Sequence, residues 1–262
     1  MRRLIITVLR LLPIVIGASG IAILGLWLVR QLVPPAELRA SSDVVGNYLQ
    51  TVGTIYAVLL AFVVQSVWSQ FNEARILVER EANEIADLHR LVEGLPGRAR
   101  IPLQSALTRY LDAVVNDEWP AMAKGDEDTI ERIGRELDAV WDGLHRLEPI
   151  SECEKSLHGE ALSRFNDLSD ARTNRLSAAR TRMPFGLSLL LYGGAVMLVA
   201  SMYLLSVDSF VIHSIITASL AGAISHVLYL VIDLDDAFNG LWRVSTAPFE
   251  RARRHFERAP AA

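Results

Sequence analysis

Cysteine occurs once in the 262 residues, at Cys153. A single thiol has no partner in its own chain, so a scaffold of intrachain disulfides is excluded. The sequence also has no Gly-rich phosphate loop, no HExxH and no Gly-x-Ser-x-Gly. Glu154 and His158 have the spacing of two metal ligands on a helix, but without a third ligand the pattern favours a surface pair. We therefore expect no enzyme activity and no resident cofactor.

Charge is absent from four long stretches. Residues 11–29, 44–68, 185–207 and 209–232 contain no Asp, Glu, Lys or Arg. About 20 apolar residues are enough for a helix to cross a bilayer. The stretches lack the alternation of barrel strands, and only helices and closed barrels satisfy their backbone groups in lipid. The sequence thus predicts an all-α membrane protein with four transmembrane helices.

The first stretch has a second interpretation. Met1-Arg2-Arg3, an apolar segment and the small residues at positions 17–20 resemble a secretory signal, whose removal would leave a mature start near Ile21. The apolar segment continues to Val29, which is longer than the ~7–15 residues of a signal core. We therefore expect an uncleaved membrane helix.

Basic residues near the membrane ends are strongly biased to one side. That side carries Arg2, Arg3, Arg10, Arg75, Arg80, Arg172, Arg175, Arg180, Arg182, Arg243, Arg251, Arg253, Arg254 and Arg258, and the other carries Arg30 and Arg39. Cytoplasmic segments of membrane proteins carry the excess of Lys and Arg. Both termini and the middle region are therefore predicted to be cytoplasmic.

The middle region is acidic and reads as helical throughout. Residues 69–183 hold 22 Asp and Glu against 16 Lys and Arg, which disfavours nucleic acid as a partner. We expect four parts: residues 1–68 with transmembrane helices 1 and 2, a cytoplasmic helical bundle at 69–183, transmembrane helices 3 and 4 at 184–233, and a cytoplasmic tail at 234–262. The bundle is thus inserted between the second and third transmembrane helices.

One helix is predicted to pass from the membrane into the bundle. Phe71, Val78, Ile85 and Val92 recur every seven residues, with Ala74 and Leu88 between them and Leu95 after them, and Glu81 interrupts this apolar stripe. Neither Gly nor Pro occurs between residues 54 and 93, so the second transmembrane helix should continue unbroken from about 44 to 93. Further helices are expected at 98–119, closed by Pro120 and the polar Lys124-Gly125-Asp126, and at 126–147 and 151–183.

A stripe of polar and small residues follows one side of the second transmembrane helix. It consists of Asn47, Thr51, Thr54, Val58, Ala61 and Gln65. The stripe is polar at both ends and apolar in the middle, as in a water-filled pore with an apolar constriction. Thr and Ala also favour close helix packing, so the spacing leaves a pore and a helix interface open.

The fourth apolar stretch contributes two further candidates. His226 lies inside it and is either a hydrogen-bonded packing residue or a pH-sensitive group. Asp233, Asp235 and Asp236 follow at its end and form a weak candidate for a cation site, with calcium as the ion. The alternative for these carboxylates is a solvated helix end that pairs with nearby arginines.

Several stretches together resemble one family. They read YLQTVGTIYAVLLAFVV from Tyr48, EREAN from Glu79, DEWP from Asp117, the arginines at 172–182, DAFNG from Asp236 and APF from Ala247. The chain is similar to the bestrophin-like family of bacterial membrane proteins, whose function is unknown and which is distantly similar to bestrophins. Bestrophins are pentameric ion channels with four membrane helices and a large helical cytoplasmic region.

The resemblance implies a function and a set of partners. It suggests a homo-oligomeric ion channel in the bacterial inner membrane, with the second transmembrane helix lining the pore and lipid and inorganic ions as partners. It also suggests calcium at an acidic cluster near the membrane, although Asp233, Asp235 and Asp236 do not reproduce that motif. The alternative is a non-conducting membrane sensor or scaffold whose acidic helical domain docks a partner.

Overall fold

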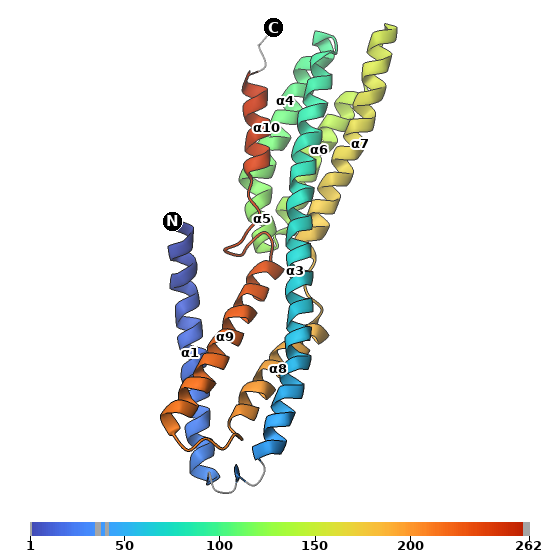
Figure 1. The fold of residues 1–262 in the computed structure, drawn as a ribbon. Helices are drawn as coiled ribbons and strands as arrows, with labels where there is room; N and C mark the ends of the chain where they lie inside the picture. Colours follow the sequence, from blue (N-terminus) through green and yellow to red (C-terminus); the bar gives the residue numbers. More distant parts are fainter. Residues whose placement is uncertain (1, 35–37, 40–41, 259–262) are drawn as a thin grey trace. The chain divides into compact units, whose positions relative to one another are not determined.

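The computed structural model describes residues 2–34, 38–39 and 42–258, and the side chains of 9–34, 38–39 and 42–257. These residues form helices and no strands, so the predicted all-α class is confirmed (Figure 1). The helices are α1 (Arg2–Leu32), α3 (Ser42–Glu93), α4 (Gly97–Ala113), α5 (Trp119–Lys124), α6 (Glu127–His145), α7 (Glu152–Arg180), α8 (Phe185–Met202), α9 (Phe210–Asp235) and α10 (Ala247–Arg258), with a π-helical segment, η1, at Val114–Glu118.

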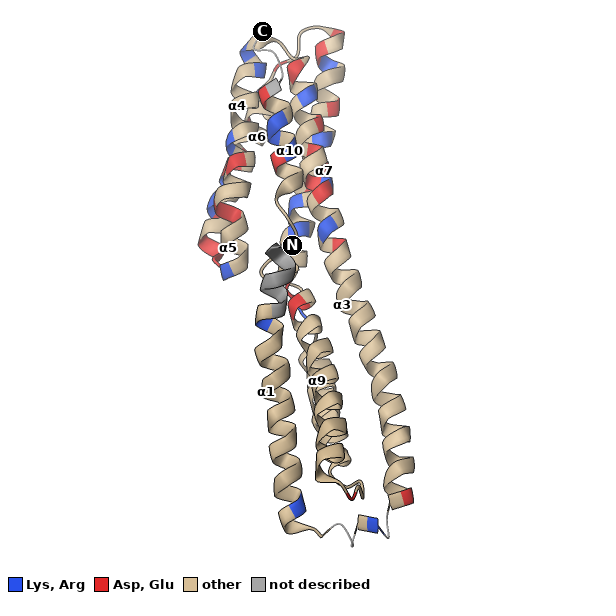
Figure 2. Cartoon of the chain, turned by 60° about the vertical axis from the view of Figure 1, so that its left-hand side comes forward, with Lys and Arg blue, Asp and Glu red and all other residues tan. Residues whose placement is uncertain are grey.

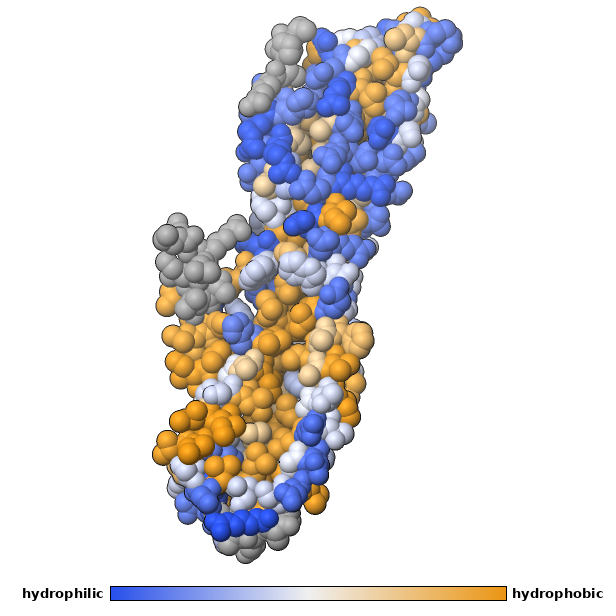
Figure 3. Space-filling view, viewed as in Figure 1, coloured by the Kyte–Doolittle hydropathy of each residue, from blue (hydrophilic) through white to orange (hydrophobic). Residues whose placement is uncertain are grey.

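The chain divides into two compact units. The first contains Met1–Ser69 and Arg182–Asp235, and the second contains Gln70–Thr181 and Asp236–Ala262. The first unit holds the apolar stretches of α1, α3, α8 and α9, four helices that are long and apolar enough to cross a membrane. In Figure 2 the charged residues of the first unit lie near the ends of its apolar stretches and in the connections between them, whereas the helices of the second unit carry charged residues along their length. The face of the first unit seen in Figure 3 is mainly hydrophobic, and that of the second unit is mainly hydrophilic. Residues 236–258 belong to the second unit.

Small residues allow the helices of the first unit to approach closely. A Cβ added at Gly222 of α9 would lie 3.1 Å from the Ser19 hydroxyl of α1, and that hydroxyl donates to the Ala218 carbonyl at 3.0 Å. A Cβ added at Gly194 of α8 would lie 2.6 Å from the Tyr56 ring of α3. The helices therefore pack through glycine and hydroxyl contacts, as is typical of membrane bundles.

Helix α3 is continuous over 52 residues from Ser42 to Glu93, as predicted. Its last turn ends at Gly94, where the backbone N–H groups of Gly94 and Leu95 bond three residues back. The absence of helix breakers after Gly53 explains the length.

The second unit has one hydrophobic core, to which α3, α4, α6 and α7 contribute. The apolar stripes predicted from helical spacing are buried there: Val78, Ile85, Leu107, Ile133 and Leu168 are all 0% exposed. Turning these faces inward removes them from water, which is the main driving force for the packing.

Two predicted helix ends are wrong. Pro120 does not close a helix, because the helical backbone continues from α4 through η1 and Pro120 takes an early position in α5, where its missing N–H is not needed. Helix α5 ends at Gly125, within the predicted Lys124-Gly125-Asp126 stop, and the φ of 69° at this position suits glycine. The apolar stretch to residue 207 is helical only as far as Met202, and the Met202 and Val207 carbonyls accept bonds from His213 and Arg30 instead.

Candidate functional site

The polar stripe of α3 faces outward from the protomer. Asn47, Thr51, Thr54, Val58, Ala61 and Gln65 are all exposed. Between residues 42 and 69 of this helix only Tyr56, Val63 and Val67 are buried. The stripe is therefore not covered by another described helix of the same chain.

Hydrogen bonding differs along the stripe. The hydroxyls of Thr51 and Thr54 donate to the carbonyls of Asn47 and Gln50, at 2.9 and 2.8 Å. The side-chain amides of Asn47 and Gln65 form no hydrogen bond with another described residue. An amide without a partner is costly in hydrocarbon, so these two side chains require water or a neighbouring molecule.

His226 is exposed on α9 and makes no hydrogen bond with another described residue. The buried histidine of this helix is His213, whose Nε2 lies 2.8 Å from the Met202 carbonyl. The Arg30 guanidinium lies 3.2 Å from Nδ1 of His213. Since Arg30 can only donate, Nδ1 is the acceptor and Nε2 carries the proton. Of the two histidines, His226 is the one available to a neighbour, and its pH sensitivity stays a prediction.

The carboxylates at the end of α9 are already engaged. Asp233 is 9% exposed, and a carboxylate oxygen of Asp235 accepts the backbone N–H of Met183 at 2.8 Å. Within the part of the chain that the structure describes, no group of three or more His, Cys, Asp and Glu side chains is arranged to hold a metal ion. The structure therefore gives the predicted cation site of Asp233, Asp235 and Asp236 no support.

A buried ion cluster in the second unit was not predicted. Arg175 of α7 donates through Nε and Nη2 to the carboxylate of Glu81 on α3. The same Nη2 lies 2.5 Å from Oε2 of Glu118, a residue of η1. The other carboxylate oxygen of Glu118 accepts a bond from Nη2 of Arg172 at 2.5 Å. The Tyr110 hydroxyl donates to Glu81 at 2.8 Å. Glu81, Glu118 and Arg175 are 0% exposed, so each buried charge has an opposite charge beside it.

The π-helical segment brings Glu118 into this cluster. A π-helical turn holds one residue more than an α-turn and is often found at functional positions. Burial alone lowers the pKa of Arg175, but the Glu81 and Glu118 carboxylates outweigh burial and raise the pKa well above its ordinary value. Burial, with the neighbouring Glu81 charge, raises the pKa of Tyr110. Arg175 thus stays charged and Tyr110 neutral at any physiological pH.

The C-terminal residues of the chain pack beside the cluster. The Trp119 ring lies 5.3 Å from Phe238 and 5.9 Å from Phe249, both edge to face. The guanidinium carbon of Arg175 lies 5.9 Å from the Phe249 ring centroid. Phe238 and Phe249 are 2% and 0% exposed. The segment after α9 is therefore held by the same residues that hold α3, η1 and α7 together.

Sequence reasoning had two signals for this cluster. Glu81 interrupts the apolar stripe of α3, and Glu118 lies in the Asp-Glu-Trp-Pro stretch. A charged residue at a core position predicts a buried partner. The sequence did not identify the partner, because Glu81 and Arg175 are 94 positions apart.

Comparison with known proteins gives the relationships of the chain. Its fold is similar to a crystal structure of a bacterial bestrophin homologue from Klebsiella pneumoniae with a single substitution, at a TM-score of 0.71 and 15% identity over 92% of this chain and 97% of the other. A zinc-phased structure of the Klebsiella homologue has a TM-score of 0.64 and 17% identity, over 95% of this chain and 97% of the other. A crystal structure described as a membrane protein has a TM-score of 0.71 and 16% identity, over 92% of this chain and 97% of the other.

No curated protein matches the chain. The bestrophin-like domain matches residues 16–249, which cover α1 from residue 16 onward, the other three apolar helices and the second unit as far as the first residues of α10. The chain is a membrane protein that belongs to the bestrophin-like family.

Proposed function

We propose that the protein is an oligomeric ion channel in which α3 of each subunit lines a central pore. The observation that carries the proposal is the outward stripe of α3, with its unpaired amides at Asn47 and Gln65 in a helix apolar enough to cross a membrane. A water-filled pore hydrates both amides, whereas lipid hydrates neither. Membership of the bestrophin-like family supports this function by analogy.

The packing of α3 supports the oligomer. Its membrane half buries only three side chains, Tyr56, Val63 and Val67, on the rest of the chain. A ring of identical subunits gives the remaining surface of each α3 a neighbour, and ring closure is the usual geometry of homo-oligomers. A central pore needs such a ring, because one outward helix face cannot enclose water.

The residues of the stripe define the chemistry of the pore. Asn47, Thr51 and Thr54 line one end and Gln65 the other, while Val58 and Ala61 form the apolar middle. Apolar constrictions gate ion flow because water leaves a narrow hydrophobic segment. Val58 and Ala61 are therefore the proposed gate.

Orientation is part of the proposal. The excess of arginine on one side supports a bacterial inner-membrane protein with both termini and the second unit in the cytoplasm. The continuity of α3 supports a mechanical connection between the pore and the second unit.

Ion flux into liposomes tests the proposal. Purified protein should conduct, and Val58→Asn or Ala61→Asn should raise flux about tenfold or more by hydrating the constriction. Ile212→Asn is the matched control, because Ile212 is also exposed on a membrane helix but lies on α9. Absence of flux from all of these proteins would reject the channel and favour the non-conducting sensor or scaffold.

The mass of the solubilised particle tests the ring separately. A closed oligomer is expected by native mass spectrometry. A protein that remains monomeric in both detergent and lipid nanodiscs would exclude a pore shared between subunits.

A further inference from the structure

One charged residue, Asp43, lies in the membrane half of α3. It belongs to the first turn of the helix, its side chain is exposed, and the next charged residue along α3 is Glu73. Asp43 precedes Asn47 by four residues and Ala61 by eighteen. Because eighteen residues are about five helical turns, Asp43 and Ala61 lie on the same side of α3. The outward polar stripe of this helix therefore begins with a carboxylate.

No basic side chain of the described chain forms an ion pair with Asp43. Arg39, four residues before it, is already paired with Asp208 at the surface. Arg30 on α1 donates to the Val207 carbonyl instead. The negative charge of Asp43 is thus not balanced by either of the two arginines at this end of the first unit.

The backbone at the start of α3 has the opposite preference. The first N–H groups of a helix have no partner within it, and the helix dipole places roughly half a positive charge there. A bare helix start therefore attracts anions. The full charge of Asp43 exceeds this partial charge and reverses its sign. In a ring of subunits each α3 would bring one such carboxylate to the same opening, as in cation channels with rings of Asp or Glu.

The threonine hydroxyls of the stripe also suit cations. The Thr51 hydroxyl donates to the Asn47 carbonyl at 2.9 Å, and the Thr54 hydroxyl donates to the Gln50 carbonyl at 2.8 Å. A hydroxyl has one proton to donate, so each oxygen keeps only lone pairs for an outside partner. Both threonines are exposed. Oxygen lone pairs coordinate hard cations and repel anions.

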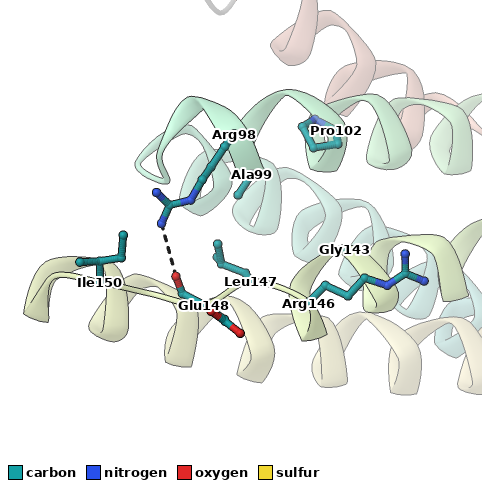
Figure 4. Close-up of a pocket in the computed structure, with 8 residues that line it drawn as sticks. All are labelled: Arg98, Ala99, Pro102, Gly143, Arg146, Leu147, Glu148 and Ile150. Atoms are coloured by element: carbon teal, nitrogen blue, oxygen red, sulfur yellow. Dashed lines mark hydrogen bonds between the residues drawn. The ribbon is translucent and has the colours of Figure 1, made fainter.

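The pocket of about 450 Å³ where α4 begins and α6 ends offers no comparable preference. In Figure 4 its two arginines, Arg98 and Arg146, point away from each other. Each has a carboxylate beside it, since Arg98 pairs with Glu154 and Arg146 pairs with Asp142. The pocket therefore presents neither converging donors nor an excess of one charge to an ion.

We propose that Asp43, together with the hydroxyl oxygens of Thr51 and Thr54, makes the pore select cations over anions. The inference rests on the proposed channel and names inorganic cations as its substrate. A carboxylate at the opening raises the local concentration of cations and lowers that of anions. The threonine oxygens then replace part of the water that a cation loses inside the pore. Asp43 is thus the residue that determines the sign of the conducted ion.

Reversal potentials in planar bilayers test the inference. Full-length protein is reconstituted, and the reversal potential in a tenfold KCl gradient gives the permeability ratio of K⁺ to Cl⁻. The ratio should exceed about five in the wild type and fall at least about fivefold, toward one, in Asp43→Asn. Asp43→Lys should bring the ratio below one because the charge is reversed. Asp43→Glu keeps the charge and should keep the preference.

Two controls separate the position of the charge from its presence. Asp138→Asn makes the same substitution at an exposed position of α6, outside α3, and should keep the wild-type ratio. The wild-type ratio should also fall when KCl is raised from about 0.1 to 1 M, because the Debye length decreases from about 10 to 3 Å. The second control needs no variant.

The outcomes distinguish this inference from the channel itself. Currents with equal ratios in Asp43→Asn and the wild type, or a wild type that prefers Cl⁻, would overturn the inference and leave the channel standing. Absence of current from every protein rejects the channel and this role with it. If Asp43→Asn does not assemble in native mass spectrometry, a double variant, Thr51→Val with Thr54→Val, takes its place. The ratio should then fall about twofold or more, and an unchanged ratio counts against the proposal.

Discussion

Arg175 on α7 and Glu81 on α3 form a two-bond ion pair in which neither side chain is exposed to solvent. Removing two charges from water costs several kcal/mol per ion, and the pair offsets this only while both partners are present. Glu118 and Tyr110 complete the hydrogen bonds of the pair. The position of α7 against α3 therefore depends on this contact more than on any exposed ion pair of the unit.

Loss of one partner of this buried ion pair should strongly destabilise the second unit. Glu81→Gln is expected to destabilise the second unit by roughly 3–5 kcal/mol, because it leaves Arg175 with a buried charge that Glu118 alone must balance. Hydrogen exchange of α3 and α7 peptides in the full-length protein gives the local free energy of opening. Arg180→Gln is the control: it breaks an exposed pair with Glu127 and should cost about 0–1 kcal/mol. Equal protection of the two variants would show that the buried pair is not important for stability.

The sequence predicted the long helix but not this ion pair, for a physical reason. Continuity of α3 follows from local information, since no Gly or Pro interrupts residues 54–93 and the apolar residues keep helical spacing. The core positions of α4 and α6 follow in the same way. Glu81 and Arg175 meet only through tertiary packing, and η1 departs from α-helical geometry without a Gly or Pro inside it. Helix α10 was likewise not predicted, because its apolar face is short and becomes buried only by packing on α4 and Trp119.

The polar stripe of α3 could be predicted, but its environment could not. Spacing placed Asn47 through Gln65 on one side of α3, and the structure adds that this side is exposed in the protomer. Periodicity alone does not distinguish a helix face that packs inside a subunit from one that faces outward. The burial of Tyr56, Val63 and Val67 on the other side makes that distinction.

Acid should weaken the docking of α10 through His89. His89 is buried and stacks on Phe256 at 3.8 Å, and its Nδ1 lies 3.4 Å from Glu93 without a hydrogen bond. Burial lowers the pKa of His89, and His255 lowers it further against the opposing charge of Glu93. A lowered pKa means that the unfolded state binds the proton more readily. The contribution of neutral His89 to the free energy of unfolding is therefore fully present above about pH 6.5, the ordinary pKa of histidine. This contribution is lost as the pH falls from there through the lowered pKa of His89.

The His89→Phe variant distinguishes the effect of protonating His89 from the effect of packing its ring. The variant keeps an aromatic ring against Phe256 but cannot titrate, so the fall of Tm below pH 6.5 should become shallower than in the wild type. His255→Gln removes only the neighbouring positive charge and should leave most of the fall in place. The same slope in His89→Phe and the wild type would exclude His89 as its source.

Gly194 of α8 should not tolerate a side chain, because a Cβ there would lie 2.6 Å from the ring of Tyr56. Gly194→Ala is expected to cost about 1–3 kcal/mol through overpacking and to lower the Tm of the solubilised protein. Gly193→Ala is an unusually close control: nothing lies within 4 Å of its Cβ, so Tm should hold or rise slightly. If both variants melt alike, α3 and α8 are not held at this distance by the glycine.

His226 should report on contact between subunits. It is exposed near the middle of α9, and an imidazole facing lipid is costly without a partner. His226→Phe keeps an aromatic ring but removes both ring nitrogens, so it should weaken the assembly by about 0.5–1.5 kcal/mol, the net worth of a hydrogen bond. We expect the oligomer of this variant to dissociate at a higher protein concentration than the wild type, measured by native mass spectrometry. Ser219→Ala, two turns away on the same outward side, leaves the imidazole in place and should dissociate as the wild type does. Equal dissociation of His226→Phe and the wild type would mean that this histidine makes no contact relevant to assembly.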